Sequence, residues 1–280
     1  MTVIDSHQHL WNLEQGSYPW LTADYGVLYR TYAYDELEPQ LASNGIDRTL
    51  LVQAADSFED TEAMLSVADA WSRVAGVVAW APLTDPSAAA GAVERYAADP
   101  RVVGIRTLMH TEADPDWVVQ DTVLESLGLL PDAGLTFDVV AVIPRHLEHV
   151  PTLAARHPSL TIVIDHLAKP RIAAGEFEPW RGLMADAAAH PNVYAKLSGL
   201  NTAADFDAWT AADLQPYIDI ALELFGPERL MFGGDWPVAV LAGDYTKVVA
   251  ETRRALSRLT EQEQDMVWGG TAIHAYGLDV

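Results

Sequence analysis

The sequence lacks cysteine, has few basic residues and has no long apolar run. Without cysteine there is no disulfide, thiolate nucleophile or thiolate metal ligand. Lysine and arginine number 17 against 40 aspartates and glutamates, a formal net charge of −23 that would repel nucleic acid and anionic membranes, so we expect neither as a partner. Residues 1–7 show no secretion signal, and no run approaches the roughly 20 apolar residues of a membrane span. We expect a cytoplasmic protein.

Short apolar runs, many of them β-branched, recur along the chain and are typical of parallel strands buried on both faces. There are eight such runs: Val3–Ile4, Arg48–Gln53, Val74–Ala81, Val102–Arg106, Leu135–Val140, Thr161–Asp165, Val193–Lys196 and Leu230–Gly233. Stretches of helical character separate them: Tyr34–Ser43, Asp60–Trp71, Ser87–Ala98, Pro144–Arg156, Trp180–Ala189, Ala212–Phe225 and Tyr245–Leu259. This alternation favours one (β/α)₈ TIM barrel over residues 1–280, with a doubly wound open sheet as the alternative.

The first connection is the longest and is rich in aromatic residues. Its residues 11–30 include two tryptophans and three tyrosines. Ligand sites of a (β/α)₈ barrel lie at the carboxyl ends of the strands. We therefore interpret residues 11–30 as a loop over the active-site mouth.

Three histidines and an aspartate stand at predicted strand ends. His7 and His9 are two residues apart, so in extended chain both imidazoles point to the same side. His166 ends the sixth strand and Asp235 follows the eighth. We expect the four to face one another, with Asp235 as the general base and the imidazoles polarising a carbonyl, with or without a metal. A structural histidine, and a turn or capping role for Asp235, are the alternatives.

Further polar and aromatic residues are candidates for substrate binding. Arg106 and Lys196 end the fourth and seventh strands, and Asp138 lies in the fifth. They either hold a substrate oxygen or form internal ion pairs with acidic neighbours such as Asp165. Three tryptophans either stack on a sugar-like ring or fill the core of the loop. They are Trp11, Trp20 and Trp236.

Four phrases carry a family resemblance: Ile4-Asp-Ser-His-Gln-His-Leu-Trp11, Val163-Ile-Asp-His-Leu-Ala-Lys-Pro170, Lys196-Leu-Ser-Gly199 and Met231-Phe-Gly-Gly-Asp-Trp-Pro237. They resemble the amidohydrolase superfamily, in particular its amidohydrolase-related branch of sugar-lactone and dicarboxylate-lactone hydrolases. The likeness spans nearly the whole chain. It implies a barrel hydrolase that opens a lactone, as relatives do with lactones of L-fuconate or L-rhamnonate, and it places His7, His9, His166 and Asp235 at the catalytic positions.

The chain departs from the two-metal members of that superfamily. Those members use a carboxylated lysine at strand four and a histidine at strand five, where this sequence has Arg106 and Asp138. We expect no two-metal centre. One zinc-like divalent ion on His7, His9 and Asp235, with His166 nearby, and metal-independent action both stay open.

Two other functions also stay open. One is a metal-dependent decarboxylase whose substrate carboxylate binds Arg106, and the other is a non-catalytic barrel that binds a sugar acid. The sequence does not specify the lactone, its ring size or the oligomeric state.

Overall fold

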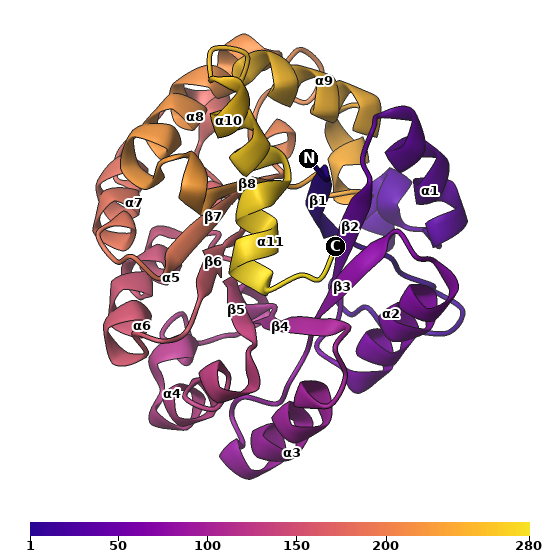
Figure 1. The fold of residues 1–280 in the computed structure, drawn as a ribbon, viewed down its shortest axis with the longest axis vertical. Coiled ribbons are helices and arrows are strands. Elements are labelled where there is room, and N and C mark those ends of the chain that lie inside the picture. Colours follow the sequence, from indigo (N-terminus) through magenta and orange to yellow (C-terminus); the bar gives the residue numbers. More distant parts are fainter.

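The computed structural model describes residues 1–280 and contains eight parallel strands, each hydrogen-bonded to the next in chain order (Figure 1). The strands are β1 Ile4–Gln8, β2 Arg48–Val52, β3 Val74–Ala79, β4 Val102–Thr107, β5 Thr136–Val139, β6 Ile162–Ile164, β7 Val193–Leu197 and β8 Leu230–Phe232. Beyond the end of β8, the N–H of His9 donates to the carbonyl oxygen of Trp236 at 2.7 Å, which joins β8 to β1. The predicted barrel is confirmed, and the open sheet is excluded.

Helices surround the strands. They are α1 Tyr34–Ser43, α2 Phe58–Ala70, α3 Pro86–Ala97, α4 Asp121–Leu127, α5 Pro144–Glu148, α6 Val150–Arg156, α7 Trp180–Ala188, α8 Ala211–Phe225, α9 Tyr245–Ala255, α10 Glu261–Asp265 and α11 Thr271–Tyr276. No helix has the length and apolar character needed to span a membrane.

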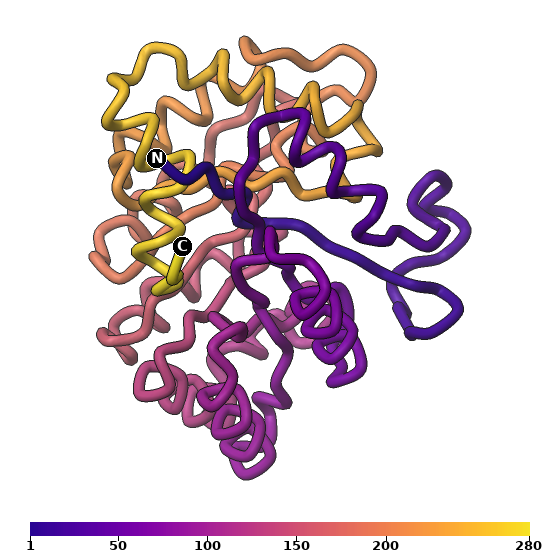
Figure 2. Tube along the Cα trace, turned by 45° about the vertical axis from the view of Figure 1, so that its right-hand side comes forward, coloured from indigo at the N-terminus to yellow at the C-terminus, as the bar shows by residue number.

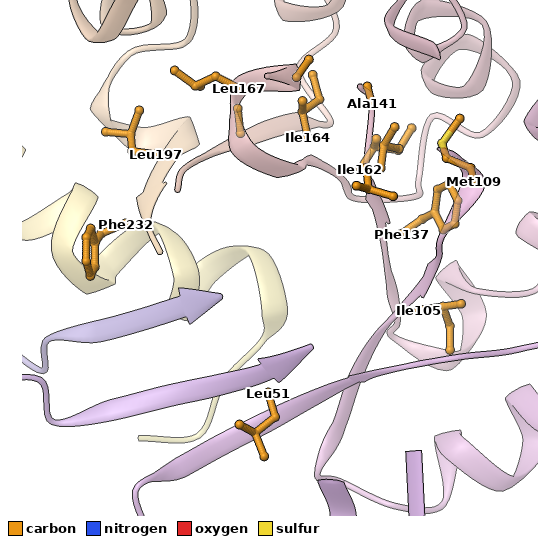
Figure 3. Close-up of a cluster of buried hydrophobic side chains, with 14 of the residues drawn as sticks. Leu51, Ile105, Met109, Phe137, Ala141, Ile162, Ile164, Leu167, Leu197 and Phe232 are labelled. Carbon is orange, nitrogen blue, oxygen red and sulfur yellow. The ribbon is translucent and has the colours of Figure 1, made fainter. Parts of the chain in front are cut away.

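The strands bury both of their faces. Alternate residues point to opposite sides, so in β6 Ile162 and Ile164 pack outward while Val163 packs into the barrel. The outer layer lies between strands and helices and includes Phe137 and Phe232 (Figure 3). Residues packed on two faces cannot alternate with polar ones, which explains the continuous apolar runs of the sequence.

Helix α11 closes the end of the barrel at which the strands begin. In Figure 1 it crosses the ring of strands, close to the chain's N-terminus. Its Ala272, Ala275 and Tyr276, with Leu278 beyond it, join the inner cluster that contains Ile4. Helix α11 therefore covers the end of the barrel where the strands begin and leaves the carboxyl end as the side for a ligand site.

Some predicted boundaries are wrong. The helix predicted over Pro144–Arg156 is divided into α5 and α6, because Pro151 at the start of α6 has no N–H to continue the first helix. The helix predicted to reach Leu259 ends at Ala255. Strand β1 continues to Gln8, so His7 lies within the strand. The short helices α4, α10 and α11 were not predicted.

The long aromatic connection after β1 extends away from the barrel as the indigo loop of Figure 2. Trp11 and Trp20 pack edge to face with ring centroids 5.5 Å apart, and the indole N–H of Trp20 donates to the carbonyl oxygen of Ala54 at 2.6 Å. That last contact fastens the loop to the chain just beyond β2. The loop thus reaches the carboxyl end of the barrel.

Candidate active site

A cavity of about 270 Å³ lies at the carboxyl end of the barrel. Residues that follow β1, β2, β4, β5, β6 and β8 contribute to its wall, as does the aromatic loop. The lining residues are His9, Trp20, Tyr25, Ala54, Arg106, Leu108, His110, Val140, Val142, His166, Lys169, Asp235 and Val238. Three of the four predicted catalytic residues line this cavity, and His7 lies buried directly beside them.

The four predicted catalytic residues meet. The Nε2 atoms of His7 and His9 are 3.0 Å apart, and Asp235 Oδ1 lies 3.9 Å from the first and 3.6 Å from the second. The other oxygen of Asp235, Oδ2, is 3.8 Å from His166 Nδ1. Gly233, just after β8, allows the chain to pass this close to His7 of β1, because a Cβ at position 233 would lie 2.7 Å from the Cβ of His7. The carboxylate therefore turns one oxygen toward His7 and His9 and the other toward His166.

Burial sets the protonation of the site. It raises the pKa of Asp235 to about 6, and it lowers the pKa of His7 to about 3 and those of His9 and His166 well below the ordinary value. Near neutral pH the three imidazoles are uncharged and Asp235 is ionised. A neutral ring nitrogen can hold a metal or donate a hydrogen bond, and an ionised carboxylate can accept a proton.

Hydrogen bonds orient the two histidines of β1. His9 Nδ1 is 2.7 Å from the carbonyl oxygen of Val52, which only accepts, so Nδ1 carries the proton and Nε2 presents a lone pair toward His7. His7 Nδ1 is 3.2 Å from Asp165 Oδ1 and 3.2 Å from Lys196 Nζ. If His7 Nδ1 donates to Asp165, the Nε2 atoms of His7 and His9 both present a lone pair, and a bound cation would satisfy both. If Lys196 instead donates to His7 Nδ1, the proton of His7 lies on Nε2, and this N–H donates to the lone pair of His9 Nε2 without a metal.

The donor set fits a single divalent ion. Two imidazole nitrogens and one carboxylate oxygen, from His7, His9 and Asp235, lie within 4.8 Å of one another, which is the usual donor type and number of a catalytic zinc site. The bond from His9 Nδ1 to a backbone carbonyl is the support that metal-binding histidines receive. A second group of donors, from His7, Asp165 and His166, shares His7 with the first group, and its Asp165 is already paired with Arg106 and Lys196.

Lys196 and Asp138 are sealed from the cavity. Lys196 Nζ lies 2.5 Å from Asp138 Oδ2 and 3.1 Å from Asp165 Oδ1, and all three side chains are fully buried. The hydroxyl of Tyr276 in α11 donates to Asp138 at 2.8 Å. These contacts favour the ion-pair interpretation of Lys196 and Asp138. Burial opposes ionisation of Asp165, but Lys196, His7 and Arg106 hold its pKa well below the ordinary value.

Arg106 lines the cavity but is already engaged. Its Nη1 lies 3.0 Å from Asp165 Oδ2 and 3.4 Å from His7 Nε2, and its Nη2 donates to the carbonyl oxygen of Gln53. Only Nε of the guanidinium makes no hydrogen bond within the protein. Arg106 thus supplies a fixed positive charge at the wall of the cavity.

Among the predicted tryptophans, Trp20 lines this cavity, whereas Trp11 and Trp236 do not. The ring of Trp236 is buried against Tyr32, and Trp11 lines a larger cavity of about 410 Å³ between the loop and α2. None of the four predicted catalytic residues lines that second cavity. We therefore place the chemistry in the smaller cavity.

The chain after β6 adopts an unusual backbone. His166, Leu167, Ala168 and Lys169 all have φ between 48° and 58°, which forms a left-handed turn that costs roughly 1–2 kcal/mol per residue. Trp180 supports this turn by donating its indole N–H to the carbonyl oxygen of Leu167 at 2.6 Å. Backbone strain of this kind concentrates at functional sites. Here the turn brings both His166 and Lys169 to the cavity wall.

Sequence reasoning assigned no role to Lys169 or His110, although both line the cavity. Lys169 belongs to the phrase Val163–Pro170, but no strand or helix period predicts a left-handed turn. His110 follows β4 in a short 3₁₀ turn, Met109–Thr111, that no pattern indicated. Ser198 follows β7, and its hydroxyl lies 2.8 Å from His166 Nδ1.

Comparisons with known proteins identify the family of this chain. A family model described as Amidohydrolase matches residues 4–278. L-Fucono-1,5-lactonases of Burkholderia ambifaria and Burkholderia multivorans are 40% and 37% identical, across 99% and 98% of this chain and 96% of each relative. The crystal structure of an amidohydrolase from Burkholderia multivorans with bound zinc has a TM-score of 0.92 and 35% identity, with all of both chains covered. The chain belongs to the amidohydrolase family, as its four motifs predict.

Proposed function

We propose that this protein hydrolyses the lactone of a sugar acid, with Asp235 as the general base. The observation that carries the proposal is the position of this carboxylate. It lies in the cavity wall, its pKa is raised by burial to about 6, and its Oδ2 makes no hydrogen bond within the protein. An ionised base with an unoccupied acceptor oxygen can hold and deprotonate a water molecule near neutral pH. The similarity to L-fucono-1,5-lactonases supports the substrate class.

Each oxygen of Asp235 has its own part in this mechanism. Oδ2 takes a proton from water as the water oxygen attacks the lactone carbonyl. Oδ1 lies on the side of His7 and His9, where these three residues would hold a divalent ion. Such an ion supplies Lewis-acid polarisation of the carbonyl when it is bound. The protein itself excludes bulk water and keeps the three imidazoles uncharged.

His166 donates to the substrate carbonyl in this proposal. If the Ser198 hydroxyl donates to His166 Nδ1 across their 2.8 Å separation, the ring carries its proton on Nε2. That N–H then stabilises the oxyanion that forms when water adds. His9 cannot take this part, because its proton is on Nδ1, which lies against the carbonyl oxygen of Val52.

The wall of the cavity suits a small hydroxylated ring. Trp20 and Tyr25 of the loop provide aromatic surface, and polar groups such as His166 and Asp235 also line the cavity. A volume of about 270 Å³ lies just below the usual range of about 300–1,000 Å³ for small-molecule sites. These features favour a monosaccharide lactone over an extended polymer.

The test is a panel of aldonolactones, including L-fucono-1,5-lactone and L-rhamnono-γ-lactone, followed by proton release with and without a chelator. We expect the wild-type protein to turn over at least one of them and Asp235→Asn to lose about 10³-fold or more in kcat. Asp219→Asn, on the exposed face of α8, is the matched control and retains full activity. Activity retained by Asp235→Asn, or no turnover of any lactone, rejects the proposal.

The two alternative functions have distinct outcomes in the same assay. A decarboxylase releases carbon dioxide from an unsaturated or aromatic acid, and it needs a cation free to bind the carboxylate. Both terminal nitrogens of Arg106, the residue expected to bind that carboxylate, are already engaged. A non-catalytic barrel would bind a sugar acid in calorimetry and turn over no member of the panel.

A further inference from the structure

Lysine is scarce in this chain and is placed selectively. Among 17 basic residues only three are lysine: Lys169, Lys196 and Lys247. Lys196 is fully buried below the site, and Lys247 lies in α9 with its Nζ 4.4 Å from the ring of Trp209. Lys169 is the lysine that reaches the cavity, with a quarter of its side chain exposed. Arginine serves at nearly all other basic positions, so this position calls for the compact ammonium group.

The ammonium group of Lys169 has two neutral partners. Its Nζ donates to Thr202 Oγ1 at 3.1 Å and to the carbonyl oxygen of Gly199 at 3.3 Å. The nearest carboxylate oxygen is Asp235 Oδ2 at 3.8 Å, beyond hydrogen-bonding distance. Since an ammonium group has three donors, one N–H of Lys169 stays available to a ligand.

The available donor of Lys169 and the available acceptor of Asp235 are close together. Asp235 Oδ2 makes no hydrogen bond within the protein and lies 3.8 Å from the ammonium nitrogen. At that separation one oxygen atom can contact both groups at ordinary hydrogen-bond lengths of about 2.8 Å. Arg106, the other basic residue in the wall, cannot act in the same way because Asp165 and Gln53 hold it.

We propose that Lys169 binds the ring oxygen of the lactone and stabilises the negative charge that develops there as the ring opens. This inference rests on the proposed lactone hydrolysis. The water oxygen bonds to the carbonyl carbon and its proton moves to Asp235. The bond between the acyl carbon and the ring oxygen then breaks, its electron pair stays on the ring oxygen, and the proton on Asp235 passes to that oxygen. Lys169 stabilises the departing oxygen until the proton arrives.

The first test compares Lys169→Met with Lys247→Met on the best aldonolactone of the panel. Removal of one charged donor from a developing anion lowers kcat by about 100-fold, whereas KM changes by less than about threefold. Lys247→Met retains the wild-type kcat. A loss confined to KM, or an unchanged kcat in Lys169→Met, overturns the assignment.

The absence of cysteine makes a charge-rescue test possible. Lys169→Cys introduces the single thiol of the chain, and 2-bromoethylamine converts it to an ammonium side chain of lysine length. We expect this product to regain at least a tenth of the wild-type kcat, and the 2-bromoethanol product, which is neutral and equally long, to regain none. Equal recovery with both reagents overturns the assignment. So does the absence of recovery with 2-bromoethylamine, when mass spectrometry shows that the protein is alkylated and the protein is folded.

The leaving group separates this role from polarisation of the carbonyl. The corresponding aldonothiolactone expels a thiolate, which needs less stabilisation than an alkoxide. The fold-loss of kcat caused by Lys169→Met is therefore at least ten times smaller on the thiolactone than on the lactone. Equal losses place Lys169 elsewhere in the reaction. If the wild-type protein opens neither ring, the proposed function itself fails, so the two failures are distinguishable.

Discussion

His7 and His9 hold their Nε2 atoms 3.0 Å apart, and Asp235 Oδ1 stands within 3.9 Å of both. Two lone pairs at this distance repel unless a cation or a proton lies between them. We therefore expect protein that has been stripped with chelator to take up one equivalent of zinc per chain, measured by inductively coupled plasma mass spectrometry. His9→Asn abolishes this uptake. A stoichiometry of two would contradict the reading of Arg106 and Asp138 as replacements for a second site.

The pH dependence of kcat/KM follows from Asp235. Burial raises the pKa of this carboxyl to about 6, and the base works only when it is ionised. Activity is accordingly full above pH 7 and falls with unit slope as the pH drops through about 6. Circular dichroism at pH 5 checks that the protein is still folded. A profile that stays flat down to pH 4.5 would remove Asp235 from the role of base.

Ser198→Ala tests whether the hydroxyl controls the orientation and tautomer of His166. The substitution keeps the Cβ and removes only the oxygen that lies 2.8 Å from His166 Nδ1. Loss of such a supporting partner lowers activity by about 10- to 100-fold. We expect the loss in kcat with little change in the melting temperature. An equal loss in Ser57→Ala, which caps α2, would show that the effect is one of general stability.

The buried ion pairs beneath the site give a stability prediction. Lys196→Met leaves Asp138 and Asp165 without their shared cation, and breaking a buried pair in this way destabilises by about 3–5 kcal/mol. Tyr276→Phe removes one hydrogen bond to Asp138 and costs about 1 kcal/mol. Urea unfolding measures both. A milder effect of Lys196→Met than of Tyr276→Phe would contradict the proposed hierarchy.

The sequence predicted the barrel and the meeting of His7, His9, His166 and Asp235 because those features depend on local order. Buried parallel strands give continuous apolar runs, and the functional residues of a barrel lie at the strand ends. His166 and Asp235 could therefore be predicted to lie together although they are 69 positions apart in the sequence. Pairing across the barrel leaves no such trace. That Lys196 bonds to Asp138 rather than to a substrate depends on side chains from β5 and β7, which meet only after closure.

The position of Lys169 in the cavity wall could not be predicted from the sequence, for a second reason. Its place depends on four successive residues with left-handed backbone, and none of His166, Leu167, Ala168 and Lys169 is a glycine that would signal positive φ. The helix boundary at Pro151, in contrast, was visible in the sequence and was missed. Pro151 lies in the middle of the segment predicted as one helix, Pro144–Arg156, and a proline at such a position ends the helix before it.

Residues far apart in the sequence pack together at the end of the barrel where the strands begin. Tyr276 and Leu278 pack with Ile4 of β1, so the inner core is incomplete until residues 276–278 have been translated. Until then the strands and outer helices can form, but the apolar residues of the inner cluster stay exposed to water.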